Sequence, residues 1–294
     1  MVMDTLTIER LIRISKENPL LPETFVPWGN KREEHEGYLP DELVSVHGLS
    51  LYDQLTREQI LEIEKHEVVQ VMYSYGWSEA MFCLFLNKYI LDKSPHDAEF
   101  RFILRELIEE FRHQDMFAQA VQLLDGRPIK PTRQHFFWGK FTAKYLPASW
   151  AFMSALSVEL IADVYGKAMR RDEKVYSVLR KISELHHIEE GRHIHFAKHI
   201  LDRYTKKAGF IKRSWFSAIL ALNVHYMRTL YVKEEIFRRA GVRDPKAVYK
   251  EAYKNYKNKF AKACLDDAIE FANSFNGMNW LTRPLWRRLL NADV

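Results

Sequence analysis

The chain has 294 residues, of which 47% are hydrophobic and 28% charged, the composition of an ordinary globular protein. Its two cysteines exclude a disulfide framework and a thiolate metal cluster, so a reducing cytoplasm is the expected location. The net charge of +5 is spread along the chain, and we therefore expect no nucleic-acid partner. Residues 1–21 hold no continuous apolar run, so we expect no secretory signal.

Helical periodicity dominates the sequence and strand-like alternation is nearly absent, which predicts an all-α protein. We expect residues 1–294 to form a single domain. It would consist of a proline-rich N-terminal extension over 1–56 with one short helix, a core bundle over about 57–204, and C-terminal helices over about 212–290.

The predicted bundle helices begin and end at recognisable signals. The first covers about 57–92 and starts at the capping box TREQ, residues 56–59. The second starts at SPHDAEF, with Ser94 as N-cap and Pro95 as first helical residue, and ends near Gly126. The third and fourth cover about 147–170 and 173–204. Residues 145–158 carry no charge but are too few to span a bilayer, so a buried helix is predicted there.

Two further helices are predicted over about 212–240 and 245–273, with the sequence RDP at 243–245 between them. The last segment, WLTRPLWRRLL at 280–290, is rich in tryptophan, leucine and arginine. We expect it to dock on the chain's own helices, and contact with a membrane surface is the less favoured alternative.

The sequence contains an internal repeat. Each copy has an E-E-x-R-H box, EEFRH in the first and EEGRH in the second, and each box follows an earlier glutamate. The interval from that glutamate to the second glutamate of the box is the same in both copies, from Glu79 to Glu110 and from Glu159 to Glu190. The matching positions are Glu79 and Glu159, Glu109 and Glu189, Glu110 and Glu190, Arg112 and Arg192, and His113 and His193.

This spacing has a chemical meaning if each copy is a helical hairpin. A turn of about four residues leaves arms of about 20 Å, so residues at this interval lie at one height on antiparallel helices. Two packed hairpins then bring four glutamates and two histidines to one level, the arrangement of di-iron and di-manganese carboxylate proteins. Glu79 and Glu159 lie among apolar residues, where an unpaired carboxylate is costly unless a cation balances it.

The histidine-rich stretch HHIEEGRHIHF, residues 186–196, adds a seventh candidate ligand. His186 stands four residues before Glu190 and seven before His193, so the three share one helical face. The expected outward positions are His187, Ile188, His195 and His199. A zinc protease fits less well, because neither H-E-x-x-H nor H-x-x-E-H occurs.

These motifs, with the run from His47 to Phe82 that precedes them, resemble the p-aminobenzoate N-oxygenase family over about residues 47–200. The resemblance implies a ferritin-like four-helix bundle with additional N- and C-terminal helices. It also implies that seven residues bind two iron ions: Glu79, Glu110, His113, Glu159, His186, Glu190 and His193. Manganese in one or both positions remains an alternative.

The activity implied by the resemblance is O2 activation through a peroxo-diiron species. A small organic substrate would be oxidised at an amine nitrogen, or hydroxylated at a C–H bond. We expect an external electron donor, such as a reductase or ferredoxin, because the sequence shows no flavin or iron–sulfur motif. A homodimer is also considered.

The boxes are also similar to those of soluble acyl-carrier-protein desaturases, which lack the histidine at 186. The first repeat has Glu106 at the position that corresponds to His186, so this histidine is not a product of the duplication. We therefore favour the N-oxygenase family. A ferritin-type iron-storage protein is a competing hypothesis, and so is a scaffold without metal, in which arginines neutralise the buried glutamates.

Supporting roles are predicted for the residues around the ligands. We expect Glu189 to accept a hydrogen bond from His113 and Glu109 to accept one from His193, because a ligating imidazole usually donates its other N–H to a carboxylate. Asp163 is predicted to orient His186. Arg112 and Arg192 would balance the added charge, and surface salt bridges are the alternative for all five. The predicted substrate pocket consists of Tyr73, Trp77, Phe82, Phe111, Met116, Phe117 and Met153.

Overall fold

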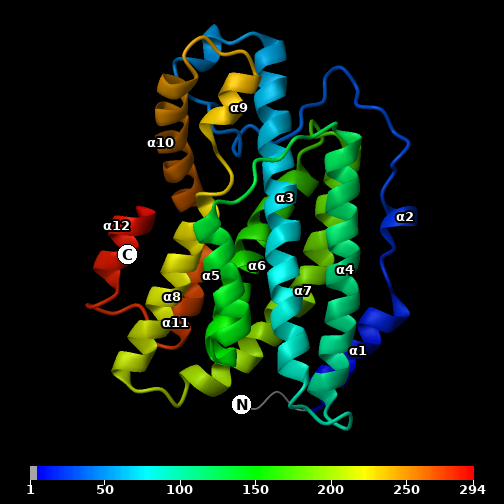
Figure 1. Ribbon diagram of the computed structural model, residues 1–294, viewed down its shortest axis with the longest axis vertical. Coiled ribbons are helices and arrows are strands. Elements are labelled where there is room, and N and C mark those ends of the chain that lie inside the picture. Colours follow the sequence, from blue (N-terminus) through cyan, green and yellow to red (C-terminus); the bar gives the residue numbers. More distant parts are fainter. Residues whose placement is uncertain (1–4) are drawn as a thin grey trace.

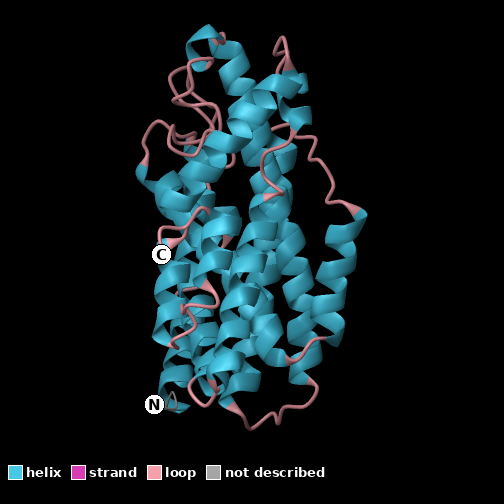
Figure 2. Ribbon diagram, turned by 90° about the vertical axis from the view of Figure 1, so that its left-hand side faces the viewer, coloured by secondary structure: helices cyan, strands magenta, loops and turns pink. Residues whose placement is uncertain are grey.

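The computed structural model describes residues 5–294, and within this range every regular element is a helix (Figures 1 and 2). The one exception is an isolated β-bridge between Gly37 and Val175. The all-α prediction is therefore confirmed for the described residues.

Four long helices form the bundle: α3 (Arg57–Ile90), α4 (Ala98–Leu123), α6 (Ala148–Arg171) and α7 (Ser177–Thr205). Two antiparallel hairpins, α3–α4 and α6–α7, pack against each other through α3 with α6 and α4 with α7 (Figure 1). Residues 91–97 and 172–176 make the two turns. This is the ferritin-like arrangement that the two E-E-x-R-H boxes predict, so the predicted fold class is confirmed.

The start of α3 is the predicted capping box. The Thr56 side chain accepts from the Gln59 N–H at 3.2 Å, and the Gln59 side chain accepts from the Thr56 N–H at 3.1 Å. The predicted start of α4 at Ser94 is wrong. Ser94 Oγ accepts from the His96 N–H, two residues on, and so closes a turn; the helix begins at Ala98, with Asp97 as N-cap.

Helix α5 (Arg133–Tyr145) connects the two hairpins in the sequence and packs on α3 and α6. No helix is predicted for this region from the sequence. Its start is a capping box in which His135 takes the place of the usual Glu or Gln. Thr132 Oγ1 accepts from the His135 N–H, and the imidazole accepts from the Thr132 N–H. This unusual box explains why the start is hard to recognise.

Shorter helices flank the bundle at both ends of the chain. Before it come α1 (Thr5–Glu17) against α4, α2 (Pro22–Phe25) against α7, and the 3-10 turn η1 (Tyr52–Gln54). After it come α8 (Phe210–Arg228) on α6, α9 (Glu234–Arg239), α10 (Pro245–Cys264), α11 (Asp266–Ser274) and α12 (Arg283–Leu290) on α8.

The two uninterrupted C-terminal helices predicted over 212–240 and 245–273 are each broken. Leu230, Tyr231 and Val232 are all buried in succession, which one face of a helix cannot achieve, and the chain is extended before α9. The second break falls at Leu265, which is buried between α10 and α11.

The C-terminal segment docks on α8 as expected. Trp286 is fully buried, and its indole N–H donates to Ser217 Oγ at 3.0 Å. Trp280, by contrast, is 75% exposed. Among residues 5–294 no helix combines the length and apolar character needed to cross a membrane.

The N-terminal extension supplies the cap of α7. Gly37 N donates to Lys174 O at 2.7 Å and Tyr176 N donates to Gly37 O at 2.9 Å, which fixes the extension across the α6–α7 turn. The adjacent Glu36 is buried, and its Oε1 accepts from the Ser177 N–H at 3.1 Å. Glu36 therefore caps α7 in place of Tyr176, whose side chain makes no capping hydrogen bond.

Replacing this cap should destabilise the fold without touching the bundle core. We expect Glu36→Ala to lower the free energy of unfolding by about 1 kcal/mol, because the Ser177 N–H at the start of α7 loses its acceptor. The exposed neighbour Glu34 is the matched control, and Glu34→Ala should stay within about 0.5 kcal/mol of the wild type. Urea unfolding measures both, and equal effects of the two changes would contradict the capping role.

Candidate metal centre

All seven predicted ligand side chains meet inside the bundle, one or more from each long helix. They are between 0% and 4% exposed. Helix α3 provides Glu79, α4 provides Glu110 and His113, α6 provides Glu159, and α7 provides His186, Glu190 and His193. The equal intervals in the two copies of the repeat do place these residues at one level of the bundle.

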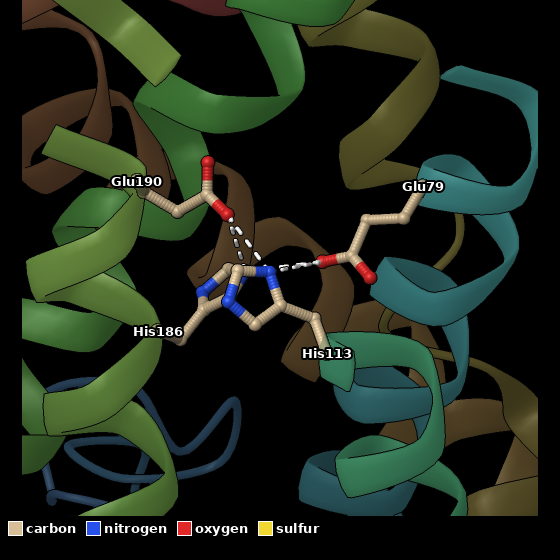
Figure 3. Close-up of side chains that lie close together, drawn as sticks. All are labelled: Glu79, His113, His186 and Glu190. Atoms are coloured by element: carbon tan, nitrogen blue, oxygen red, sulfur yellow. Dashed lines mark hydrogen bonds and ion pairs between the residues drawn. The ribbon is translucent and has the colours of Figure 1, made fainter. Parts of the chain in front are cut away.

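The first cluster consists of Glu79, His113, His186 and Glu190, whose ligand atoms converge (Figure 3). Glu190 Oε1 lies 3.1 Å from His186 Nε2 and 3.2 Å from His113 Nδ1. On the other side, Glu79 Oε1 lies 3.1 Å from His186 Nε2 and 3.9 Å from His113 Nδ1. Two imidazole nitrogens and two carboxylates thus face one point.

The second cluster shares Glu190 with the first. Glu190 Oε2 lies 3.1 Å from His193 Nδ1, and Glu110 Oε1 lies 3.1 Å from the same nitrogen. Glu159 joins Glu110 and Glu190, with one oxygen of each within 4.8 Å of the others. Because the two oxygens of Glu190 face different clusters, this carboxylate has the geometry of a bridge.

The unpaired atoms of the centre fit a pair of cations. Glu79 Oε2, both oxygens of Glu110, Glu190 Oε1 and His113 Nδ1 are buried without a hydrogen-bond partner in the described part of the chain. Buried polar atoms are nearly always paired, and leaving a carboxylate unpaired costs several kcal/mol. Carboxylate and imidazole donors together suit iron, manganese or zinc.

Without a cation the centre retains protons. Burial raises the pKa of Glu110 to about 7, and the Glu190 carboxylate adds to the effect. Burial also raises the pKa of Glu159 well above its usual value. For His186, burial acts to lower the pKa, but the carboxylates of Glu190 and Glu79 outweigh it and raise the pKa to about 9. A metal ion must therefore displace protons when it binds.

Two further carboxylates, Glu189 and Glu109, contact the ligand histidines His113 and His193 on the side that faces away from the clusters. Each contact crosses the α4–α7 interface. His113 Nε2 lies 2.9 Å from Glu189 Oε2, and His193 Nε2 lies 2.9 Å from Glu109 Oε2. An imidazole that donates from Nε2 keeps the lone pair on Nδ1, the atom that faces the cluster in both residues. The crosswise contacts are those expected from the sequence.

Arg112 and Arg192 contact these outer carboxylates. Arg112 Nη2 lies 3.3 Å from Glu189 Oε1, and Arg192 Nη2 lies 3.0 Å from Glu109 Oε1. Ser15 of α1 also donates to Glu109, at 2.5 Å. Burial acts to raise the pKa of Glu109, but His193, Arg192 and Ser15 outweigh it and hold the pKa at about 2.

The arginine contacts bear on the scaffold alternative. In the described residues the ion pairs of both arginines go to Glu109 and Glu189, which are 2% and 0% exposed and so are not surface groups. The ion pairs of Glu79, Glu110 and Glu190 go to histidines. The arginines therefore do not neutralise the inner carboxylates, as that alternative requires.

Comparison with known proteins agrees with this geometry. The model of the family described as p-aminobenzoate N-oxygenase AurF matches residues 4–276, well beyond the 47–200 of the sequence resemblance. The chain belongs to this family. AurF-family membership implies a di-iron N-oxygenase and decides for this family over the desaturase resemblance.

Relatives of this AurF-family chain occur in mycobacteria. Uncharacterised proteins of Mycobacterium bovis and of Mycobacterium tuberculosis strain H37Rv are each 23% identical over 243 residues. In both cases the match covers 80% of this chain and 71% of the relative. Neither description includes an activity, so the functional argument depends on the AurF family and on the centre itself.

The predicted role of Asp163 is wrong. Its Oδ1 lies 2.5 Å from Nδ1 of His187, not of His186, and its Oδ2 lies 2.6 Å from Lys167 Nζ. His187 is thus paired across the α6–α7 interface instead of pointing away freely. His186 is instead flanked by two aromatic rings. The Tyr75 ring stacks on the imidazole with 5.8 Å between centroids, and the Phe117 ring meets it edge-on at 5.0 Å.

Of the seven predicted pocket residues, only Phe117 lines the cavity beside His186. This cavity has a volume of about 10 Å³, room for about one water. Phe111 is 56% exposed, because it follows Glu110 directly and so faces outward, and its predicted role is wrong. The other predicted pocket residues are not among those that line this cavity: Tyr73, Trp77, Phe82, Met116 and Met153.

Sequence reasoning missed two kinds of residue. Tyr75 lines the cavity, and its position one turn before Glu79 on the same helical face could have revealed it. Glu106 entered the argument only as the counterpart of His186 in the repeat, yet it lies with Glu110 and His193 inside the second cluster.

The outer carboxylates should control metal affinity. We expect Glu109→Gln and Glu189→Gln each to weaken Fe(II) binding by about 10- to 100-fold, because a neutral amide polarises the donating imidazole less. Competition with a chelator under anaerobic conditions measures this. Glu99→Gln is the matched control, since Glu99 pairs with Lys93 and Arg203 elsewhere on α4. Unchanged affinity in both test variants would refute the supporting role.

Metal affinity should rise with pH between about 7 and 9. The pKa values of Glu110, about 7, and His186, about 9, are raised in the metal-free protein, so protons compete with the metal until the pH passes them. Calorimetry in buffers of different ionisation enthalpy should detect proton release on Fe(II) binding. An affinity independent of pH over this window would contradict the assignment of these groups as ligands.

Proposed function

We propose that this protein is an O2-dependent, non-haem di-iron oxygenase that oxidises a small organic substrate, most favourably at the nitrogen of an arylamine. The observation that carries the proposal is the pair of buried clusters joined by Glu190. In this proposal Glu79, His113 and His186 bind one ion, while Glu110, Glu159 and His193 bind the other.

When bound, the iron pair supplies the redox chemistry that activates O2. The protein's own residues do the rest. Glu109 and Glu189 hold the Nε2 protons of His193 and His113 and thereby orient both rings. The near-complete burial of the ligand side chains keeps bulk water away from the reacting atoms.

The substrate would approach on the His186 side, where the cavity lies. Its walls include Tyr75, Phe117 and Tyr165, which suit the flat face of an aromatic ring. An aromatic amine needs more room than about 10 Å³. Met72 and Met169 also line this cavity, and their flexible thioether chains can make way for the ring.

An external electron donor belongs to the proposal. O2 chemistry at an iron pair would need electrons, and the carboxylates and imidazoles of the centre do not supply them. A reductase or ferredoxin is the class of partner that would supply them.

Iron loading tests the proposal directly. After anaerobic addition of Fe(II), the wild type should hold two irons per chain and show a transient visible band when O2 is added. With a reductant and p-aminobenzoate as probe, mass spectrometry should detect N-oxygenated product. Glu190→Gln should abolish the product and the two-iron loading, because the amide cannot bridge two cations.

The matched control is Glu67→Gln, a buried carboxylate of α3 that bonds to Ser45 outside the centre and should leave iron loading at two per chain. Absence of bound iron in the wild type, or a single zinc per chain, would refute the proposed function. Gel filtration in parallel separates it from a ferritin-type protein, which would elute as a large shell.

A further inference from the structure

Glu106 is a buried carboxylate with no identified partner. It stands on α4, one turn before Glu110, and is 1% exposed. Neither of its oxygens has a hydrogen-bond partner within residues 5–294. One oxygen lies within 4.8 Å of ligand atoms of both Glu110 and His193. This carboxylate therefore faces the second cluster and needs a partner there.

The internal repeat indicates what that partner is. At the offset that relates Glu79 to Glu159, Glu106 corresponds to His186, which belongs to the first cluster with Glu79, His113 and Glu190. The repeat counterparts of those three residues are Glu159, His193 and Glu110. Glu106 thus stands in the second cluster where His186 stands in the first.

Neither neighbouring arginines nor a proton provides an adequate partner. Arg112 and Arg192 form their ion pairs with Glu109 and Glu189. Protonation would remove the charge of Glu106 but leave a buried O–H donor without an acceptor. A cation at the second cluster would satisfy the carboxylate, because ligand atoms of Glu106, Glu110 and His193 already lie within 4.8 Å of one another.

We propose that Glu106 is an eighth protein ligand and binds the second metal ion together with Glu110, Glu159, His193 and Glu190. This inference rests on the proposed dimetal function. It adds a carboxylate to the second position, which has one imidazole where the first position has two. The second position has the more oxygen-rich donor set, which suits a harder ion such as Mn(II).

The decisive variant is Glu106→Leu, which keeps a similar volume and cannot bind a metal. Under anaerobic Mn(II) titration the wild type should bind two ions per chain, and metal analysis of the leucine variant should show one. If the leucine variant still binds a second Mn(II), its affinity for that ion should be at least about 10- to 100-fold lower than in the wild type. Loss of a hydrogen-bond partner of a metal ligand alone already lowers affinity by this factor. EPR should change from a coupled pair to an isolated Mn(II) ion.

A second measurement separates a ligand from a structural residue. In the metal-free state Glu106→Leu should be at least as stable to urea as the wild type, because the change removes an unpaired buried carboxylate. Glu106→His should bind two ions again, with a changed EPR signal, because imidazole can ligate as His186 does at the repeat position. Glu67→Gln, a buried carboxylate already bonded to Ser45, should retain the wild-type titration curve.

The outcomes distinguish this inference from the proposed function. If the wild type and the leucine variant both bind two Mn(II) with the same curve, Glu106 is no ligand, although the dimetal proposal stands. Lower metal-free stability with an unchanged ion count would likewise overturn the inference and assign Glu106 to the fold. If the wild type binds fewer than two ions, the dimetal proposal fails, and the inference fails with it.

Discussion

The mutual repulsion of carboxylates enclosed in the bundle core is the constraint on which the rest of this structure depends. Glu79, Glu110, Glu159 and Glu190 are nearly inaccessible to water. Two like charges about 4 Å apart repel by about 4 kcal/mol even at an effective dielectric constant of about 20. Several such pairs would exceed the stability margin of an ordinary domain, about 5–15 kcal/mol. Protonated histidines offset part of this repulsion in the metal-free protein, and dications offset it more completely.

Residues of the N-terminal extension contact the charged groups that surround the centre. Ser15 of α1 bonds to Glu109, and Glu109 in turn holds His193. The Arg112 guanidinium, which pairs with Glu189, also donates to the carbonyl of Leu20 at 3.1 Å. Segments that look like appendages in the sequence thus complete the electrostatic surroundings of the histidines. A truncation of the extension would act on the centre as well as on the bundle surface.

The periodic and symmetric part of the molecule could be predicted from the sequence. Equal intervals in the two copies of the repeat sufficed to place Glu79, Glu110, Glu159 and Glu190 at one level of the bundle, because the rise of a helix is constant. The partner of Asp163 could not be predicted in this way. His186 and His187 are neighbours on α7, and only the rotation of α7 against α6 decides which of them Asp163 meets. Likewise, the break before α9 depends on which residues the core can bury.

Departures from the repeat then give the two sides of the centre different properties. Tyr75 and Phe117 flank His186, whereas their repeat counterparts are Ala155 and Ala197. The second side is filled instead by Phe102, one turn before Glu106, and by Phe196, whose rings pack 4.3 Å apart. Both rings are almost fully buried, so this side is closed by core packing. Symmetric hairpins can therefore provide two similar clusters, while the diverged rings Tyr75 and Phe117 line a cavity on the His186 side.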